Sequence, residues 1–324
     1  MFKASSPPFL RQVQEDSSKR EGYAPLEFVK ISVIRGFLKN KMNKNSIIGI
    51  DLGGTNIRGG VVNGFELSNI ISKKINAQGS VHEVLEEVFS LTDSLINDSV
   101  MAIGIGVPGL VNAEEKMVYD VVYIPSWKKV PLQKLMEDRY HVPVFINNDA
   151  NCFALGEFYF GKGNGINSIV GLTIGTGLGC GLIVNKKLYE GRNGGAGEFG
   201  MVSYLDKTVE YYASGQFFQN VYDTDGESVF KNAGEGNADA LKMYQEMGAH
   251  LGNAIKTIMY ALDVELIVLG GSVRHAYPYF SKTMWDEIKT FGFRNAVTNL
   301  RIEVSELQNA GMLGAAALYY DSVE

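Results

Sequence analysis

One arrangement occurs twice in this chain: an apolar strand, a glycine-rich turn and a second apolar strand. The first copy joins Ile47–Ile50 to Ile57–Val62, and the second joins Ile169–Ile174 to Cys180–Val184. Apolar runs on either side of a glycine turn predict β-hairpins. Each hairpin is followed by runs at helical and strand spacing, so the sequence predicts two similarly ordered α/β halves. A cleft between such halves is a favoured place for a small-molecule site.

The elements after each hairpin follow from the spacing of apolar residues. Helices are expected at 82–97, 132–139 and 241–258, and strands at 101–107, 142–146 and 266–269.

Size and composition limit the class of protein. With 324 residues, 45% of them hydrophobic and 20% charged, the chain can bury the cores of two domains. No run approaches the roughly 18 apolar residues of a membrane span, which predicts a cytoplasmic protein without a membrane partner. Two cysteines, Cys152 and Cys180, are too few for a disulfide framework and favour a reducing compartment.

Charge separates residues 1–45 from the rest of the chain. Nine basic and four acidic residues give this segment a charge of +5, which leaves −11 for residues 46–324. An acidic body repels nucleic acid, so no nucleic-acid partner is expected. Residues 1–45 are interpreted as an N-terminal extension: flexible, or a short amphipathic helix docked on the body or a membrane surface, or a fragment of a DNA-binding module. Met42 is an alternative start of the functional chain.

The first glycine turn has the composition of a phosphate site. Asp51 ends the strand, Gly53 and Gly54 lack a Cβ, and Thr55 and Asn56 add polar donors. Bare backbone amides in a tight turn form an anion-binding concavity. Asp51 can hold a hydrated Mg²⁺, whose charge offsets phosphate repulsion. The alternative is a hairpin turn whose glycines serve geometry alone.

Two further glycine motifs belong to the second half. The turn at 175–179, with Thr176 and Gly177, is expected to face the first turn, although alternating glycines also serve bulges and close packing. Gly270 and Gly271 follow a buried strand and suit the close approach of an adenine or ribose, with a plain turn as the alternative.

Asp149 is the acid–base candidate. It follows the predicted strand 142–146 within Asn148-Asp149-Ala150-Asn151 and precedes a helix expected near Cys152. A carboxylate at the carboxyl end of a strand points into the crevice and can accept a proton from a hydroxyl group. The alternative role of Asp149 is a helix N-cap, a position that Asn151 can also fill.

The loop at 190–201 contains five glycines around Glu198. Ordering such a loop costs entropy, so it usually serves close contact with a ligand or another chain. Glu198 and Glu210 are candidate acceptors for sugar hydroxyls, and a solvated surface role is the alternative for either one alone.

These motifs together resemble the ROK family of sugar kinases and sugar-responsive repressors, over about residues 46–320. The resemblance rests on the order of the elements already named, together with Gly106-Val107-Pro108-Gly109, Trp127, Gly197-Glu198-Phe199-Gly200 and Ala310-Gly311. It implies an actin/hexokinase-like ATPase fold of two duplicated RNase H-like domains around an interdomain cleft. The domains would comprise 46–150 with a returning helix at 310–324, and 151–309.

The resemblance also implies a function and assigns roles. The chain would be a glucokinase-like sugar kinase that uses ATP and Mg²⁺ and forms homodimers. Asp149 would be the catalytic base, and Gly109, Asn148, Glu198 and Glu210 would bind the sugar. The glycine turns at Gly53 and Gly177 would hold the ATP phosphates. A sugar-responsive regulator is the main alternative, although 45 residues are short for a winged helix-turn-helix.

The sequence departs from the family pattern at one loop. Many members have a His after the Gly-Glu-x-Gly motif and a cysteine cluster that binds structural zinc, whereas this chain has Met201 and no cysteine in 202–215. The zinc site is therefore expected to be absent, and the loop to be held by packing through Met201, Tyr204, Leu205 and Val209. The sugar stays open: glucose first, then N-acetylmannosamine, fructose and N-acetylglucosamine.

Overall fold

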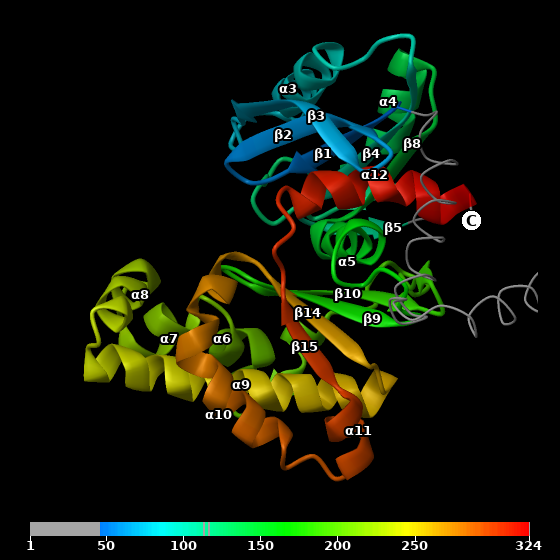
Figure 1. Ribbon diagram of the computed structural model, residues 1–324. Coiled ribbons are helices and arrows are strands. Elements are labelled where there is room, and N and C mark those ends of the chain that lie inside the picture. The colour runs from blue at the N-terminus through cyan, green and yellow to red at the C-terminus, as the bar shows by residue number, and fades with distance from the viewer. Residues whose placement is uncertain (1–45, 113, 116, 324) are drawn as a thin grey trace, which may run out of the picture. The chain divides into compact units, whose positions relative to one another are not determined.

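A five-stranded sheet organises the first half of the chain in the computed structural model, which describes residues 46–112, 114–115 and 117–323 (Figure 1). Its strand order is β3-β2-β1-β4-β8. The strands β1, β2 and β3 are antiparallel, whereas β4 and β8 run parallel to β1. Their bounds are Ser46–Leu52 (β1), Asn56–Asn63 (β2), Glu66–Lys74 (β3), Val100–Val107 (β4) and Val144–Asn148 (β8).

A second sheet repeats this topology in the second half. Its order is β11-β10-β9-β14-β15, with three antiparallel strands followed by two strands parallel to β9. The bounds are Lys187–Leu188 (β11), Leu178–Val184 (β10), Ile169–Ile174 (β9), Leu266–Gly270 (β14) and Arg301–Val304 (β15). Both predicted hairpins are confirmed, and the two halves share one strand order.

The other predicted helices and strands are also present, with bounds that differ by a few residues. The helices are α3 (Val81–Asp93), α4 (Leu132–Tyr140) and α9 (Ala238–Leu262). A small sheet of β5 (Leu110–Asn112), β6 (Met117–Tyr119) and β7 (Lys129–Val130) follows β4. A hairpin of β12 (Ser203–Tyr204) and β13 (Lys207–Thr208) precedes the short helix α6 (Val209–Ala213).

Two helices, α5 (Asp149–Phe160) and α12 (Ala310–Val323), lie side by side between the sheets (Figure 1). The helix α5 packs on β9 and β10, and the C-terminal helix α12 packs on β1 and β4. The chain thus returns to the first sheet at its C-terminal end. Backbones meet closely here, since a Cβ added to Gly314 would lie 1.6 Å from the Cys152 carbonyl oxygen. Only a residue without a side chain allows this approach.

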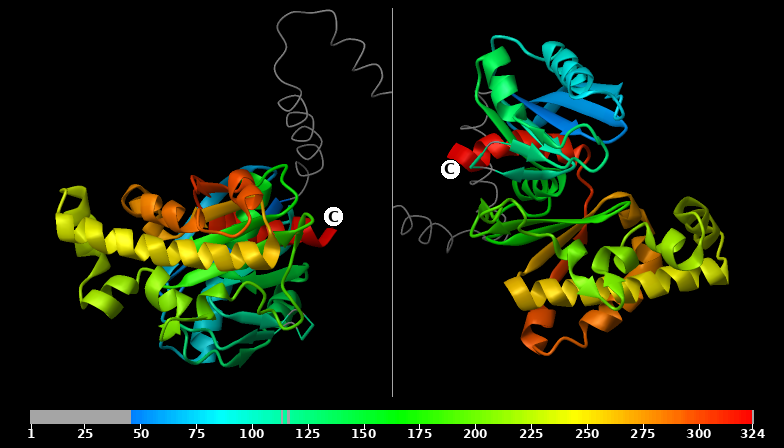
Figure 2. Two further views of the ribbon diagram at one scale, coloured as in Figure 1. Left: turned by 90° about the horizontal axis from the view of Figure 1, so that it is seen from below. Right: turned by 180° about the vertical axis from the view of Figure 1, so that it is seen from behind.

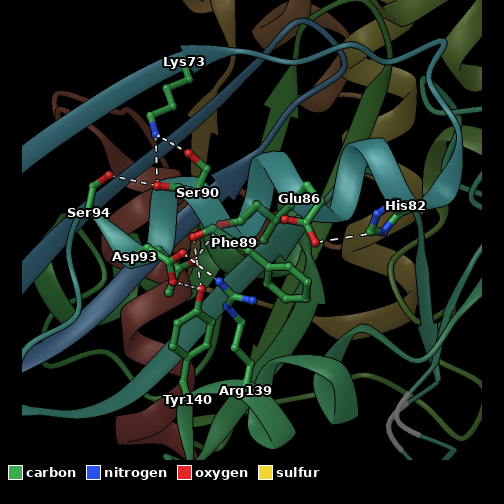
Figure 3. Close-up of polar contacts among 11 residues, drawn as sticks. Lys73, His82, Glu86, Phe89, Ser90, Asp93, Ser94, Arg139 and Tyr140 are labelled. Carbon is green, nitrogen blue, oxygen red and sulfur yellow. Dashed lines mark hydrogen bonds and ion pairs between the residues drawn. The ribbon is translucent and has the colours of Figure 1, made fainter.

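Helices α3 and α4 are joined by a polar cluster on the outside of the first sheet (Figure 3). Arg139 donates to Asp93 at 2.8 Å, and its guanidinium lies 4.7 Å from the centre of the Phe89 ring. The Tyr140 hydroxyl donates to Asp93 at 2.7 Å. The C-terminal end of α4 is thereby attached to the C-terminal turn of α3.

The second half carries a helical layer over its sheet. The long helix α9 and α10 (Tyr277–Ile288) lie side by side (Figure 2). The shorter helices are α6 (Val209–Ala213), α7 (Phe217–Tyr222), α8 (Gly226–Gly234) and α11 (Arg294–Asn299). Buried side chains of α9, including Met247, Leu251 and Ile255, form one core with the sheet. No helix in the described part of the chain has both the length and the apolarity of a membrane span.

The contact at Gly314 predicts that Gly314→Ala destabilises the protein. The added Cβ would meet the Cys152 carbonyl oxygen, and overpacking of this kind costs about 1–3 kcal/mol. The measurement is the midpoint of thermal or denaturant unfolding. Gly234→Ala is the matched control, because its Cβ would come no closer than 3.5 Å to the Tyr279 hydroxyl. Equal midpoints for the two variants would contradict the prediction.

Candidate functional site

The N-terminus of α5 forms the centre of the candidate site. The N-cap is Asn148, whose Oδ1 accepts a hydrogen bond from the Ala150 N–H at 2.8 Å. The expectations that the helix begins near Cys152 and that Asn151 caps it are therefore wrong, because the strand β8 runs directly into the helix. Since Asn148 fills the cap, the alternative role of Asp149 as N-cap falls away.

Asp149 is the first residue of α5 and has a perturbed carboxyl group. The residue is exposed, yet the protein around it limits the hydration of its carboxyl group. This loss of hydration is the largest cause of a pKa raised to about 6; the charge of Asp51 also raises the pKa, while the bond from the Ala150 N–H lowers it. A carboxylate with such a pKa is suited to accept a proton near neutral pH.

Asn148 also reaches the turn that follows β4. Its Nδ2 donates to the Gly109 carbonyl oxygen at 3.2 Å. The structure therefore places two of the predicted sugar-binding residues, Gly109 and Asn148, in direct contact beside Asp149.

The first glycine turn is closed by its own backbone. The Gly53 N–H donates to the Asn56 carbonyl oxygen at 2.9 Å, which leaves Gly54 and Thr55 at the tip of the turn. A Cβ on Gly54 would lie 2.4 Å from the Tyr123 Cβ, so the Tyr123 side chain packs on this turn. Packing of Tyr123 against Gly54 therefore explains the glycine at this position, with or without a ligand at the turn.

Asp51 lies at the end of β1 next to the start of α12. A Cβ on Gly311 would come within 2.9 Å of its carboxyl group. Burial raises the pKa of Asp51, and the charge of Arg58, which stands opposite Asp51 in the β1–β2 register, lowers it. Arg58 donates to the Asn309 Oδ1 at 2.5 Å and so connects β2 to the beginning of α12.

The second glycine turn is held by the segment that follows α6. The Ser214 hydroxyl donates to the Thr176 carbonyl oxygen at 2.9 Å, and the Gly215 N–H donates to the Gly175 carbonyl oxygen at 2.7 Å. The Thr176 side chain stays exposed at the tip. These two hydrogen bonds hold the turn in place, while the exposed Thr176 at its tip is accessible to a ligand.

Glu210 belongs to this second turn as well as to the predicted sugar site. Its Oε2 accepts from the Leu178 N–H at 2.8 Å, and it occupies the space that a Cβ on Gly177 would need. The charge of Glu210 also raises the pKa of Glu198, which burial raises first. The two glutamates therefore lie near each other, with one oxygen of Glu210 engaged by the backbone.

A pocket of about 780 Å³ lies in the second half, beside Thr176. Its walls include the aromatic side chains of Phe218, Phe230 and Tyr244 and the segment from Ser272 to Ala276. Mostly apolar walls with a few polar groups are typical of small-molecule pockets. Asp149 does not line this pocket, so the pocket and the carboxylate are separate parts of the candidate site.

Gly270 and Gly271 lie at the edge of this region but face the protein itself. A Cβ on Gly270 would meet the Phe153 ring at 2.4 Å, and one on Gly271 would lie 2.2 Å from the Ile174 carbonyl oxygen. Gly271 also has a positive φ of 76°. These contacts explain both glycines without a ligand and support the plain-turn alternative, whereas the residues that follow them line the pocket.

The loop from Glu198 to Glu210 is held differently from the expectation. Met201 and Leu205 are 62% and 69% exposed, so the prediction that they pack is wrong, whereas Val209 is buried. Tyr204 packs against the core of the second half, as predicted, and its hydroxyl lies 3.1 Å from the His250 Nδ1, with the two rings 5.6 Å apart. A short hairpin leaves one face of the loop in solvent, and an aromatic contact to α9 holds the other.

Two residues of the site were not singled out from the sequence: Arg58 and Tyr123. Each acts through a partner far along the chain, as Arg58 does with Asn309. Arg58 could have been found, because it stands opposite Asp51 in the predicted hairpin.

The site as a whole is acidic. The charges of Asp51 and Glu198 both act on Asp149, and that of Glu210 acts on Glu198. A phosphate ester entering such a site needs a cation to offset repulsion. Mg²⁺ fits, because it is usually held by one or two carboxylates, water and substrate phosphates rather than by a cage of protein ligands. The described residues contain no group of three or more His, Cys, Asp or Glu side chains placed to hold a metal.

The comparisons with known proteins assign the family. The model of the ROK family matches residues 47–322, and the chain therefore belongs to the ROK family. A glucokinase of Thermotoga maritima is 26% identical over 87% of this chain and 99% of its own length. A xylose repressor of Caldicellulosiruptor bescii is 28% identical over 94% of this chain and 86% of its own.

A solved structure agrees in sequence and in fold. The ROK family glucokinase of Streptomyces griseus, in complex with glucose and AMPPNP, is 25% identical, with a TM-score of 0.72 over 85% of this chain and 99% of the other. Together with the two sheets of equal topology, this similarity shows an actin/hexokinase-like ATPase fold.

The loop geometry predicts that chelation leaves the fold intact. Structural zinc usually needs four Cys or His ligands, and its removal unfolds the segment that it organises. Here the contact between Tyr204 and His250 holds the loop. Melting curves with and without EDTA should therefore coincide, and elemental analysis should find no stoichiometric zinc. A chelator that lowers the melting temperature would show that a metal organises this loop.

Proposed function

We propose that this protein is an ATP- and Mg²⁺-dependent sugar kinase with Asp149 as its general base. The observation that carries the proposal is the position of Asp149: it lies at the first residue of α5, open to solvent, with a pKa raised to about 6. The similarity to glucokinases over most of the chain supports the same activity. Sugar and ATP are the partners in this proposal, and nucleic acid and membranes are not.

The residues around Asp149 bind and orient the sugar. The Asn148 side chain, which donates to the Gly109 carbonyl oxygen, contributes polar groups, and Glu198 and Glu210 supply acceptor oxygens. A hydroxyl held next to Asp149 transfers its proton to the carboxylate as its oxygen becomes the nucleophile. Glucose is the first candidate substrate because the relatives include glucokinases.

The nucleotide would be held by both glycine turns and the pocket of the second half. Gly54, Thr55 and Thr176 lie at the tips of the turns, where backbone and hydroxyl donors suit phosphate oxygens. The aromatic wall of the pocket, with Tyr244 and Phe218, offers an apolar surface for a purine base. Asp51 would hold Mg²⁺ through water, and bound ATP with Mg²⁺ supplies the phosphoryl group and neutralises its charge. A cytoplasmic location and a homodimer remain part of this proposal.

A sugar-responsive transcriptional regulator is the second candidate, and one observation favours it. The match to the xylose repressor covers 94% of this chain, so it extends beyond residues 47–322, which match the family model, into the basic N-terminal segment. A gel-shift assay of the full chain against DNA upstream of sugar-utilisation genes, with and without sugar, distinguishes the two functions. Sugar-dependent release from DNA without any kinase activity would favour the regulator.

The proposal predicts sugar-dependent release of ADP. A coupled assay with ATP, Mg²⁺ and a panel of glucose, N-acetylmannosamine, fructose and N-acetylglucosamine should detect turnover with at least one sugar, at typical kinase rates of about 1–100 s⁻¹. Omitting Mg²⁺ should abolish it. Release of ADP that does not depend on sugar, or no release with any sugar, would contradict the proposal.

Asp149→Asn should lower kcat and kcat/KM together by about 10²–10⁴-fold, because the change removes a general base and leaves ground-state binding in place. In the unchanged protein kcat/KM should rise with pH up to about 6 and then level off, since only the ionised carboxylate accepts a proton. This acidic limb should vanish in Asp149→Asn.

Asp138→Asn is the control for the loss of one negative charge, because Asp138 forms an exposed ion pair with Lys134 on α4. It should leave kcat and the acidic limb unchanged. Near-normal turnover of Asp149→Asn with intact sugar binding would rule out Asp149 as the base.

A further inference from the structure

The glycine-rich loop of residues 190–200, which carries Glu198, is anchored by its backbone. A Cβ on Gly194 would lie 2.0 Å from the Val111 carbonyl oxygen, and one on Gly197 would lie 2.1 Å from the Cys180 carbonyl oxygen. Both glycines have positive φ, at 74° and 94°. The Ala196 N–H donates to the Glu190 carbonyl oxygen at 3.1 Å and closes the loop on its first residue.

Glu190, at the start of this loop, binds a buried amide on the strand that leads to Asp149. Its Oε1 accepts a hydrogen bond from the Asn147 Nδ2. Asn147 is only 4% exposed. Its Oδ1 accepts from the Asn148 N–H and from the Asn151 Nδ2, both at 2.8 Å. The amide is thus fixed on both sides: its oxygen faces the start of α5, and its nitrogen faces the loop.

The contact therefore joins two segments that carry the residues proposed to hold the sugar. Asn147 directly precedes Asn148 and Asp149, while Glu190 begins the loop that presents Glu198. We propose that the hydrogen bond between Asn147 and Glu190 is a positioning contact, which sets the separation of Asp149 and Glu198 and so the fit of the sugar between them. The inference rests on the proposed kinase function and adds two residues that act through others.

Both side chains of the Asn147–Glu190 hydrogen bond need a polar partner. Glu190 is half-buried, and a carboxylate removed from water needs a donor. The buried amide of Asn147 likewise needs an acceptor for its N–H group. Each group therefore satisfies the other, and separating them would leave the buried Asn147 N–H group without its acceptor. Misplacement of a substrate-orienting group by about 1 Å can lower a rate by about 10²-fold, so a contact of this kind can control sugar use without touching the sugar.

Exchanging the donor and the acceptor tests the proposal. Asn147→Asp alone sets a carboxylate against Glu190, and its kcat/KM for sugar should fall by about 10–100-fold while KM for ATP stays the same. Glu190→Gln alone keeps an acceptor oxygen, so its kcat/KM for sugar should fall less. The double variant Asn147→Asp/Glu190→Gln restores one donor and one acceptor with the direction of the hydrogen bond reversed. Its log(kcat/KM) for sugar should recover at least half of the drop measured for Asn147→Asp alone.

All variants are assayed well above the pKa of about 6 of Asp149, so that the base stays ionised. Asn185→Asp and Glu306→Gln are the matched controls, because both side chains are exposed and lie outside the site. They should keep the unchanged protein's kinetics. Melting temperatures of every variant separate a folding defect from a positioning defect.

Three outcomes decide the matter. A drop in kcat/KM for sugar, with the KM for ATP unchanged and with recovery in the double variant, supports the positioning contact. Equal losses for sugar and ATP that follow the melting temperature, or no recovery in the double variant, overturn it. If the unchanged protein phosphorylates no sugar, the proposed function fails and this inference falls with it, and that result is visible before any variant is made.

Discussion

The close packing of α5 on α12 is the constraint on which the rest of the structure depends. Two backbone contacts between the helices exclude any side chain: Gly314 lies against the Cys152 carbonyl and Gly156 against the Ala310 carbonyl. A third, Gly104 of β4 against the Ala315 carbonyl, packs α12 equally closely on the first sheet. The two helices pack on different sheets, so their contact connects the halves of the fold. It also brings the N-terminus of each helix to a carboxylate, since Asp149 begins α5 and Asp51 lies against Gly311. Helix N-termini stabilise negative charge and so reduce the free-energy cost of placing these carboxylates in one site.

The electrostatics of the site follow from this arrangement. Asp51 lies near the end of β1, and Asp149 directly follows β8, which β4 separates from β1 in the same sheet. The charge of Asp51 raises the pKa of Asp149, as like charges near each other do. Arg58 offsets part of the charge at Asp51, while the groups that lower the pKa of Asp149 are backbone N–H groups, its own and that of Ala150. The two carboxylates therefore differ in environment, and in the proposed kinase Asp51 holds the hydrated cation while Asp149 exchanges a proton.

Membership of the ROK family does not by itself fix the activity, because the relatives include both glucokinases and xylose repressors. A shared fold carries different functions through its site residues and appended segments. In this chain the argument for a kinase rests on Asp51, Asp149 and the pocket beside Thr176, whereas the argument for a regulator rests on residues outside the described structure. The loop after Glu198 is held by packing on the helical layer: the contact between Tyr204 and His250 attaches its hairpin to α9.

The sequence by itself determined the two hairpins and the helices, because apolar periodicity and glycine turns act over a few neighbouring residues, and it singled out Asp149 as the acid–base candidate. It also marked the loop around Glu198, since five glycines in one loop are unusual. It did not determine that Asn148 rather than Asn151 caps α5, that Glu210 binds the Leu178 N–H, or that Gly270 and Gly271 face the protein. Nor did it pair Asn147 with Glu190. These contacts join residues that lie far apart in the chain or compete for one position. Only the packing of the two sheets through α5 and α12 decides which groups come within hydrogen-bonding distance.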